Sequence, residues 1–195
     1  MEAVEAPAAN GEEDEDIELQ LEKFKESLKP EARRFTWLHT GIPGSIFIST
    51  KLEDPMQLAH AIMTAPDLEP PQAMIRLIPI AVSCKAFQEN IVRAVGELVA
   101  KFPSEPALRF RVHIKSRYNS SFSKDSVMEG ILEVVRSHHP NWVPTYQNYT
   151  HSLLVEVLKT TCCLSFLGDY EELCKYNLVE LGKVAKTPAP PDHTT

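Results

Sequence analysis

The spacing of apolar positions along this chain follows the helical period in some segments and the extended period in others. Over residues 84–102, apolar side chains recur every three or four positions, which predicts an amphipathic helix with one buried face. A second such stripe follows Ser123 and Asp125, either of which is a suitable N-cap. A third helix is predicted to begin at Asp54–Pro55, a cap followed by proline, and to end near Ala65.

Short apolar runs between these helices predict β-strands. Residues 108–117 alternate most regularly, and Pro79 within another run indicates an edge strand or a bulge. Strands that alternate with helices predict an α/β or α+β fold with a covered sheet. The predicted strands are Ser45–Thr50, Met74–Val82, Leu108–Arg117, Leu153–Leu158 and Cys162–Leu167, and a short helical segment is predicted around Glu171–Leu181.

Both ends of the chain depart from this pattern. Residues 1–16 are acidic and of low complexity, so they lack the apolar surface that would offset the entropy of ordering. Residues 186–195 are rich in proline and predict a flexible tail. Residues 17–29 predict a short helix with one apolar stripe, which consists of Ile17, Leu21, Phe24 and Leu28.

The net charge of −7 is unevenly distributed. Residues 1–31 hold 11 acidic and 3 basic side chains, whereas the other 164 residues hold 16 acidic and 17 basic ones. The folded part is therefore nearly neutral and can carry a local basic surface. No apolar run reaches the roughly 18 residues of a membrane span, and the first residues lack the features of a secretory signal. We therefore expect an intracellular protein that does not contact membranes.

The segment 109–117 places cations on one face of its strand. Because strand side chains alternate, the apolar residues face the core and the polar ones face away from it. Such a row suits a phosphate backbone, since cations release counterions and donate hydrogen bonds to phosphate oxygens. The alternative is a solvated edge strand whose charges oppose aggregation. The row consists of Arg109, Arg111, His113, Lys115 and Arg117, and no carboxylate interrupts it.

A polar loop, residues 119–124, follows directly and leads into a helix. Its hydroxyls, amide and helix N-terminal N–H groups are suited to hold a phosphate, although the same residues also suit a simple capping loop. Aromatic residues in or near loops could stack on bases, but aromatic side chains more often complete a core. These aromatics are Tyr118, Phe122, Trp142, Tyr146 and Tyr149.

The sequence offers little that indicates catalysis. None of the common nucleotide-binding, metalloprotease or nucleophile-elbow motifs occurs. The pair His138–His139 lacks further ligands at metal-binding spacing. Cys162 and Cys163 lie in an apolar run, where a nucleophilic thiolate is disfavoured, and we predict that all four cysteines are reduced thiols. We therefore expect no enzyme activity, no cofactor and no metal.

Several stretches together point to a known family. The longest are Ile114–Ser120 (IKSRYNS), Lys124–Asp125 at a helix start, and Leu154–Ser165 (LVEVLKTTCCLS). These stretches resemble the eukaryotic THUMP-domain tRNA acetylation adaptors over residues 34–182, and similarity of this length is more specific than a short motif. Shorter matches are Arg76–Ile80 (RLIPI), Cys84–Phe87 (CKAF), Asp169–Tyr170 and Lys175–Leu178 (KYNL).

The resemblance implies an α/β fold with a ferredoxin-like N-terminal portion followed by a THUMP α/β core. On this basis residues 1–31 are an acidic tail, 32–82 the ferredoxin-like portion, 83–183 the THUMP domain and 184–195 a flexible tail. The implied task is to present serine and leucine tRNAs to an RNA cytidine acetyltransferase that makes N4-acetylcytidine. We expect the protein in the nucleus, including the nucleolus, and also in the cytoplasm. A fused modifying domain is not expected.

The predicted RNA contacts combine the strand, the loop that follows it and a later turn. The basic residues would neutralise phosphates, and the amide and hydroxyl would hydrogen-bond backbone or ribose groups. One rival hypothesis is a protein-interaction scaffold that does not bind RNA directly, and another is an enzyme with a hidden thiol or histidine site. The predicted contacts are Arg111, Lys115, Arg117, Asn119, Ser121, Lys124 and Lys159.

Overall fold

The described residues form two compact units. The computed structural model describes residues 34–65, 73–104, 106–120 and 123–186, and the units divide between Leu52 and Glu53. The acidic tail and the helix expected at 17–29 lie outside the described residues. The division falls earlier in the chain than the predicted boundary after residue 82, and the ferredoxin-like portion stays a prediction.

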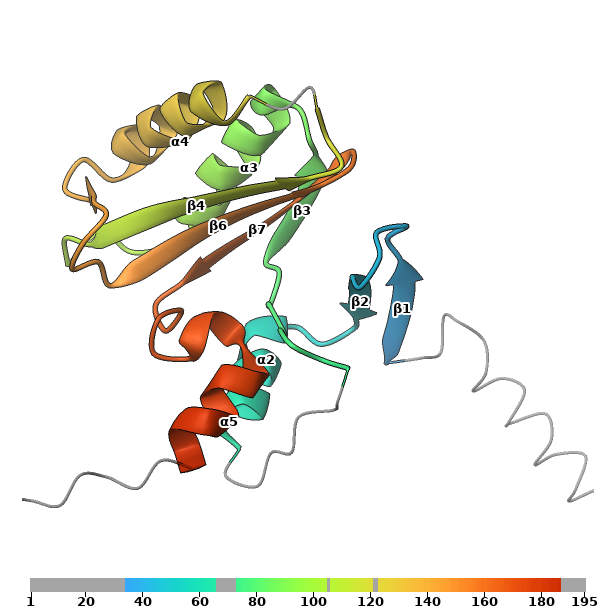
Figure 1. Ribbon diagram of the computed structural model, residues 1–195. Helices are drawn as coiled ribbons and strands as arrows, with labels where there is room; N and C mark the ends of the chain where they lie inside the picture. The colour runs from blue at the N-terminus through green and yellow to red at the C-terminus, as the bar shows by residue number, and fades with distance from the viewer. Residues whose placement is uncertain (1–33, 66–72, 105, 121–122, 187–195) are drawn as a thin grey trace, which may run out of the picture. The chain divides into compact units, whose positions relative to one another are not determined.

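The first unit contains a β-hairpin. Strand β1 (Phe35–His39) pairs antiparallel with β2 (Ile46–Thr50), as Figure 1 shows. The connecting turn uses Gly41 and Gly44 with φ of 66° and 69°, a region where side chains other than glycine are strained. The turn is closed by Thr40, whose hydroxyl donates to the Ser45 carbonyl at 2.8 Å. The predicted strand at 45–50 is confirmed, whereas β1 was not predicted.

The second unit is built on a five-stranded sheet with the order β3-β7-β6-β4-β5 (Figure 1). The central strand β6 pairs parallel with β4 and antiparallel with β7, so the sheet is mixed. Strand β4 lies inside the sheet, but its neighbour β5 covers only Arg109 and Phe110. The strands are β3 (Val82–Lys85), β4 (Arg109–Arg117), β5 (Val143–Pro144), β6 (His151–Leu158) and β7 (Thr161–Leu167).

Two helices cover one face of this sheet. Helices α3 (Gln88–Val99) and α4 (Lys124–His138) pack on the apolar side chains of β4, β6 and β7 to form the main core (Figure 1). The cap of α4 is Ser123 rather than Asp125, because the Ser123 hydroxyl accepts a hydrogen bond from the Ser126 N–H. The face toward the sheet carries fully buried Ile91 and Ile131, as the helical stripes predict.

The opposite face is covered over part of its area by a second core. Helix α2 (Pro55–Thr64), the 3₁₀ turn η2 (Cys174–Tyr176) and helix α5 (Leu178–Lys186) pack around Leu154 and Leu167. The start of α2 at its Asp54 cap is as predicted. Helix α5 extends to residue 186, so the first residues that we assigned to the C-terminal tail are helical.

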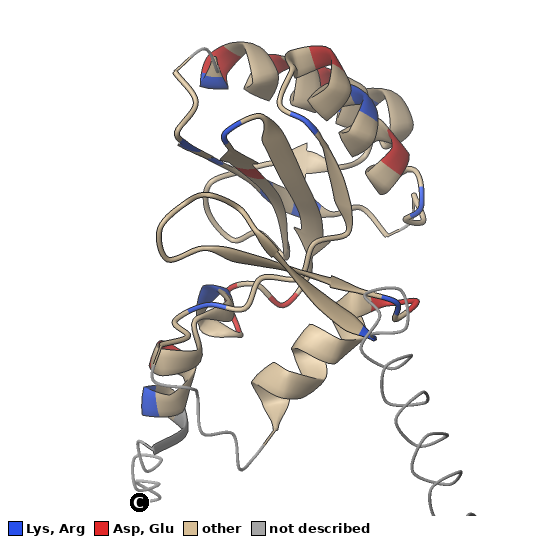
Figure 2. Ribbon diagram, turned by 90° about the vertical axis from the view of Figure 1, so that its right-hand side faces the viewer, with Lys and Arg blue, Asp and Glu red and all other residues tan. Residues whose placement is uncertain are grey.

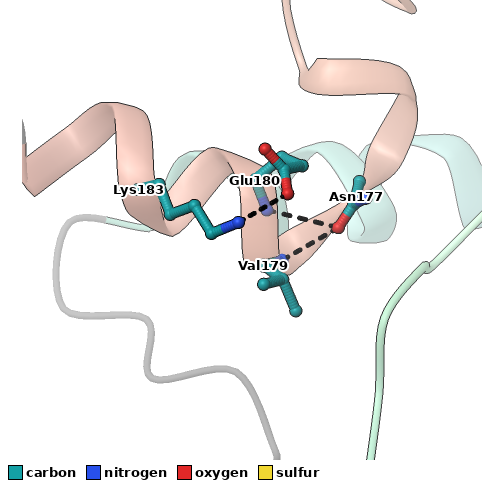
Figure 3. Close-up of polar contacts among 4 residues, drawn as sticks. All are labelled: Asn177, Val179, Glu180 and Lys183. Carbon is teal, nitrogen blue, oxygen red and sulfur yellow. Dashed lines mark hydrogen bonds and ion pairs between the residues drawn. The ribbon is translucent and has the colours of Figure 1, made fainter.

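Helix α5 begins with a side-chain cap. The carboxamide oxygen of Asn177 accepts from the backbone N–H groups of Val179 and Glu180 at 3.1 and 3.2 Å (Figure 3). One turn later, Lys183 pairs with Glu180 at 2.8 Å. Because the first N–H groups of a helix have no partner within it, this cap fixes where α5 starts against the sheet.

Two predicted elements are wrong in extent. Within residues 74–80, the Leu77 N–H donates to the Tyr176 carbonyl at 3.1 Å and the Ile75 carbonyl accepts from the Leu178 N–H at 3.0 Å, so this segment bonds the start of α5 and β3 begins only at Val82. The helix predicted from residue 84 begins at Gln88, because Cys84 lies in β3 opposite Cys162. None of the described helices is long and apolar enough to cross a membrane.

Candidate nucleic-acid interface

Strand β4 presents its polar residues on the face opposite the main core. Phe110 is buried in that core, and Val112 and Ile114 pack against it. The intervening side chains therefore point to the other face, as the alternation predicts. The environment of these side chains differs from one end of the row to the other.

Lys115 is paired with a carboxylate from the adjacent strand. Lys115 and Glu156 are register partners on β4 and β6, and the lysine Nζ lies 3.2 Å from the Glu156 Oε1. The Glu156 side chain is only 12% exposed, so the ammonium compensates a largely buried charge. No carboxylate lies within the basic row of β4 itself, but in the folded sheet Glu156 of the neighbouring strand β6 interrupts the row. The alternation within β4 could not predict this, because it carries no information about β6.

Arg111 lies among tyrosine rings. Its guanidinium carbon is 5.6 Å from the ring centroid of Tyr149 and 5.8 Å from that of Tyr146, within the range of cation–π contacts. The Tyr149 hydroxyl donates to Glu171 at 2.5 Å, and burial together with this carboxylate raises the pKa of Tyr149. Tyr146 is 75% exposed. Arg111 is thus held in place by rings, one of which faces solvent.

His113 is uncharged at neutral pH. Its ring lies 5.2 Å from that of Tyr170, and one ring nitrogen is 3.3 Å from the Ser152 hydroxyl. Burial, and then the positive charge of Arg111, lower the pKa of His113 to about 4. The middle of the row therefore contributes no charge at pH 7.

The end of β4 is joined to the turn between β6 and β7. Asn119 donates from its side-chain amide to the Lys159 carbonyl at 2.7 Å, and the Lys159 N–H donates to the Arg117 carbonyl at 3.0 Å. Tyr118 and Lys159 have φ of 56° and 55°, left-handed conformations that this pairing holds. Residues 40 positions apart are thereby fixed side by side.

The predicted contacts fall into two groups in space. Arg117, Asn119 and Lys159 gather at the end of the sheet, whereas Arg111 and Lys115 lie further along β4 with partners of their own. Lys124 is the first residue of α4, which follows the same loop. Ser121 lies outside the described residues. Figure 2 faces this end of the sheet, where lysine and arginine segments surround the strand ends.

Sequence reasoning missed Lys85, a cation at the same end. Lys85 is the last residue of β3 and is exposed, and its register partner is Thr161 of β7. The adjacent Ala86 N–H donates to the Thr160 carbonyl at 2.8 Å, in the same turn as Lys159. The apolar stripe of α3 continues back into residue 84 in the sequence, so the strand that carries Lys85 was assigned to the helix.

The thiols and histidines do not assemble a reactive centre in the described part of the chain. Burial raises the pKa of Cys163 to about 11 and that of Cys162 further, so both stay protonated at neutral pH. His139 is buried, stacks on Trp142 and bonds the Val99 carbonyl at 2.8 Å. No group of three His, Cys, Asp or Glu that could hold a metal occurs among the described residues.

The sheet and its two covering helices are similar to a known protein domain. Residues 85–167 match the THUMP domain. This region runs from Lys85 at the end of β3 to Leu167 at the end of β7, and so includes α3 and α4. It also includes the end of the sheet that carries Lys85, Arg117 and Lys159, which we call the basic end of the sheet.

Similarity to relatives extends beyond the THUMP domain. Mouse THUMP domain-containing protein 1 is 30% identical over 192 residues, covering 94% of this chain and 55% of the relative. The Drosophila melanogaster homologue is 33% identical over 171 residues, covering 85% of this chain and 52% of the relative. The chain thus spans about half the length of the curated relatives it matches, and their names state a domain rather than an enzyme activity.

A solved structure shares the fold. The crystal structure of PH1313 from Pyrococcus horikoshii superposes with a TM-score of 0.51 at 13% identity, over 85% of this chain and 52% of that one. The predicted mixed α/β architecture with a THUMP core is therefore confirmed.

Proposed function

We propose that this protein is an RNA-binding adaptor that presents tRNA to an RNA cytidine acetyltransferase for N4-acetylcytidine formation. THUMP domains are found in RNA-binding and tRNA-modification proteins, and residues 85–167 match this domain. The acetyltransferase, the serine and leucine tRNAs and the nuclear and cytoplasmic location come from the resemblance of the sequence stretches described above, and they belong to this proposal.

The observation that carries the proposal is the basic end of the sheet. Arg117, Lys124 and Lys159 form no ion pair with any described carboxylate. Cations without an acidic partner remain available to phosphate oxygens and release counterions when they bind. Asn119 holds the turn that carries one of these cations, so the amide acts by positioning as well as by direct contact.

The second candidate is a protein-interaction scaffold. It is favoured by the partners of Arg111 and Lys115, since a row whose cations are already engaged resembles a structural face more than a phosphate track. In this hypothesis an acidic protein surface would dock on the basic end of the sheet, and the enzyme alone would bind tRNA.

Fluorescence anisotropy with labelled serine tRNA tests the proposal directly. We expect the purified full chain to bind tRNA with micromolar or tighter affinity, and the affinity to fall steeply as salt rises. Arg117→Glu combined with Lys159→Glu should weaken binding tenfold or more, because two phosphate contacts become repulsive. Lys101→Glu combined with Lys183→Glu changes the net charge equally, in the turn after α3 and on α5, away from the β6–β7 turn, and this control should stay within about twofold.

The adaptor role requires a second readout. An acetylation assay with the RNA cytidine acetyltransferase and serine tRNA should yield more N4-acetylcytidine when this protein is present, and the Arg117→Glu/Lys159→Glu variant should lose that gain. Absence of tRNA binding at low salt, with the gain in acetylation retained, would establish the scaffold instead.

A further inference from the structure

The turn between β6 and β7 is bonded to strands on both of its sides. On one side Lys159 is tied to β4, through its own N–H to Arg117 and through its carbonyl to Asn119. On the other side the Thr160 carbonyl accepts from Ala86, the residue after β3. The turn therefore lies between the ends of two strands that are not neighbours in the sheet.

The register places four residues in one row across this end. Arg117 of β4 is opposite Leu158 of β6, Leu158 is opposite Thr161 of β7, and Thr161 is opposite Lys85 of β3. All four side chains lie on the face that bears Lys115, because each partner pair in a sheet shares a face. A cation thus stands at each end of the row, and Lys159 projects from the turn between them.

We propose that Lys85 is a further RNA-contacting residue, and that the RNA backbone crosses the end of the sheet from Arg117 over Lys159 to Lys85 rather than running along β4. This inference rests on the proposed RNA-binding function and specifies the path of the ligand at the same site. Lys85 would donate to phosphate oxygens, as the other two cations do.

The state of the other cations disfavours a path along β4. Going from Arg117 toward Arg111, an RNA strand would meet Lys115, which compensates Glu156, and then His113, which is neutral. Breaking the lysine pair would leave a largely buried carboxylate without its partner. Further along, the face is covered by the second core around Leu154 and Leu167.

The path across the sheet meets no such obstacle among the described residues. Lys85, Arg117 and Lys159 are exposed and form no ion pair with a described carboxylate. Three strand spacings separate β4 from β3, which is about 14 Å, a span that reaches several consecutive phosphates. Of the two side chains between them, Thr161 is small and exposed and Leu158 is half-buried, so the row presents little steric hindrance.

Binding of labelled serine tRNA to full-length variants tests the path. Lys85→Glu should weaken binding fivefold or more at 0.1 M salt, and Lys85→Ala should reduce the slope of log K against log salt by somewhat less than one unit, the loss of one phosphate contact. Lys101→Glu, in the turn that follows α3, makes the same change in net charge and should stay within about twofold. Thermal unfolding of each variant checks that the fold is retained.

The outcomes separate this inference from the proposed function. If Lys85→Glu behaves like Lys101→Glu while Arg117→Glu/Lys159→Glu weakens binding, the protein binds RNA but the path across the sheet is wrong. If the wild-type chain fails to bind tRNA, the proposed function and this inference both fall. A loss of fivefold or more with Lys85→Glu, with Lys101→Glu within about twofold of the wild type, supports the path.

Discussion

His113 couples the stability of the sheet face to pH. Its pKa is about 4 in the folded chain, against about 6.5 for an unfolded histidine. Between these values the unfolded chain binds the proton and the folded chain does not, so protonation favours unfolding. The stability that His113 contributes is fully present above about pH 6.5 and is lost as the pH falls toward 4.

We therefore predict that the urea midpoint of unfolding falls between pH 7 and pH 5, and that His113→Gln makes this fall shallower. Glutamine can keep a hydrogen bond to Ser152 but does not titrate in this range. Part of the slope should remain in the variant, because burial lowers the pKa of His151 as well. Identical pH profiles of wild type and variant would show that His113 is not the titrating group.

The pair between Lys115 and Glu156 should stabilise the sheet even though it interrupts the basic row. Lys115→Met leaves a carboxylate that is 12% exposed without a counter-charge, and we predict a loss of about 1–2 kcal/mol in the free energy of unfolding, less than for a fully buried pair because the lysine is 40% exposed.

Combining Lys115→Met with Glu156→Gln should recover most of that loss, since no unpaired charge remains. Urea unfolding of the two single variants and the double variant gives the coupling energy directly. Additive losses, with no recovery in the double variant, would mean that the pair does not interact energetically.

At the scale of elements, helices α3 and α4 approach each other at a glycine. A Cβ at Gly130 would lie 2.6 Å from a methyl carbon of Val92, closer than packed carbon atoms can approach. We predict that Gly130→Ala destabilises the fold by about 1–3 kcal/mol through overpacking, despite the better helix propensity of alanine.

Gly182 is the matched control in a helix. A Cβ there meets nothing within 4 Å, so Gly182→Ala should be neutral or should stabilise by up to about 1 kcal/mol. Adding Val92→Ala to Gly130→Ala should relieve the overlap and recover part of the loss in thermal unfolding. A stabilising Gly130→Ala would show that the two helices separate without cost.

Local periodicity predicted the elements whose extent depends on their own sequence and not on which strand they pair with. The alternation of β4, the stripe of α4 and the Asp54–Pro55 start of α2 appear where the pattern put them, and the stripe of α3 does so from Gln88 onward. The periodicity failed where hydrogen-bond pairing with a distant segment determines whether residues form a strand. Residues 74–80 are apolar enough for a strand, but the backbones of Ile75 and Leu77 bond those of Leu178 and Tyr176 instead of a strand of the sheet.

The same distinction applies to the candidate interface. Lys159 and Arg117 could be named from the sequence, and the hydrogen bonds now join them. Glu156 opposite Lys115, and Lys85 at the end of the row, follow from register across four strands, which depends on contacts far apart in the chain. Periodicity within one strand contains no information about that register.

At the scale of the whole molecule, the charge is divided between the N-terminal segment and the rest. Residues 1–31 carry a net charge of −8 and the remainder +1. A segment of this charge repels RNA over a distance set by the Debye length, about 10 Å at 0.1 M salt and longer at lower salt.

We predict that replacing Glu12, Glu13, Asp14, Glu15 and Asp16 by their amides raises tRNA affinity a few-fold at 0.02 M salt, and that the difference disappears by 0.3 M. Anisotropy titrations at both salt concentrations measure the effect. A gain that persists at high salt would instead indicate a specific contact between these residues and the basic end of the sheet.

The bond from Asn119 to the β6–β7 turn also bears on how a ligand would be recognised. Because Arg117 and Lys159 are attached to one hydrogen-bonded unit, their backbone spacing is set before any ligand arrives. Preorganised groups lose little conformational entropy on association. Recognition would then resemble the fit of a rigid template, with free and bound backbones nearly superimposable and selectivity for ligands whose charges already match the template's spacing.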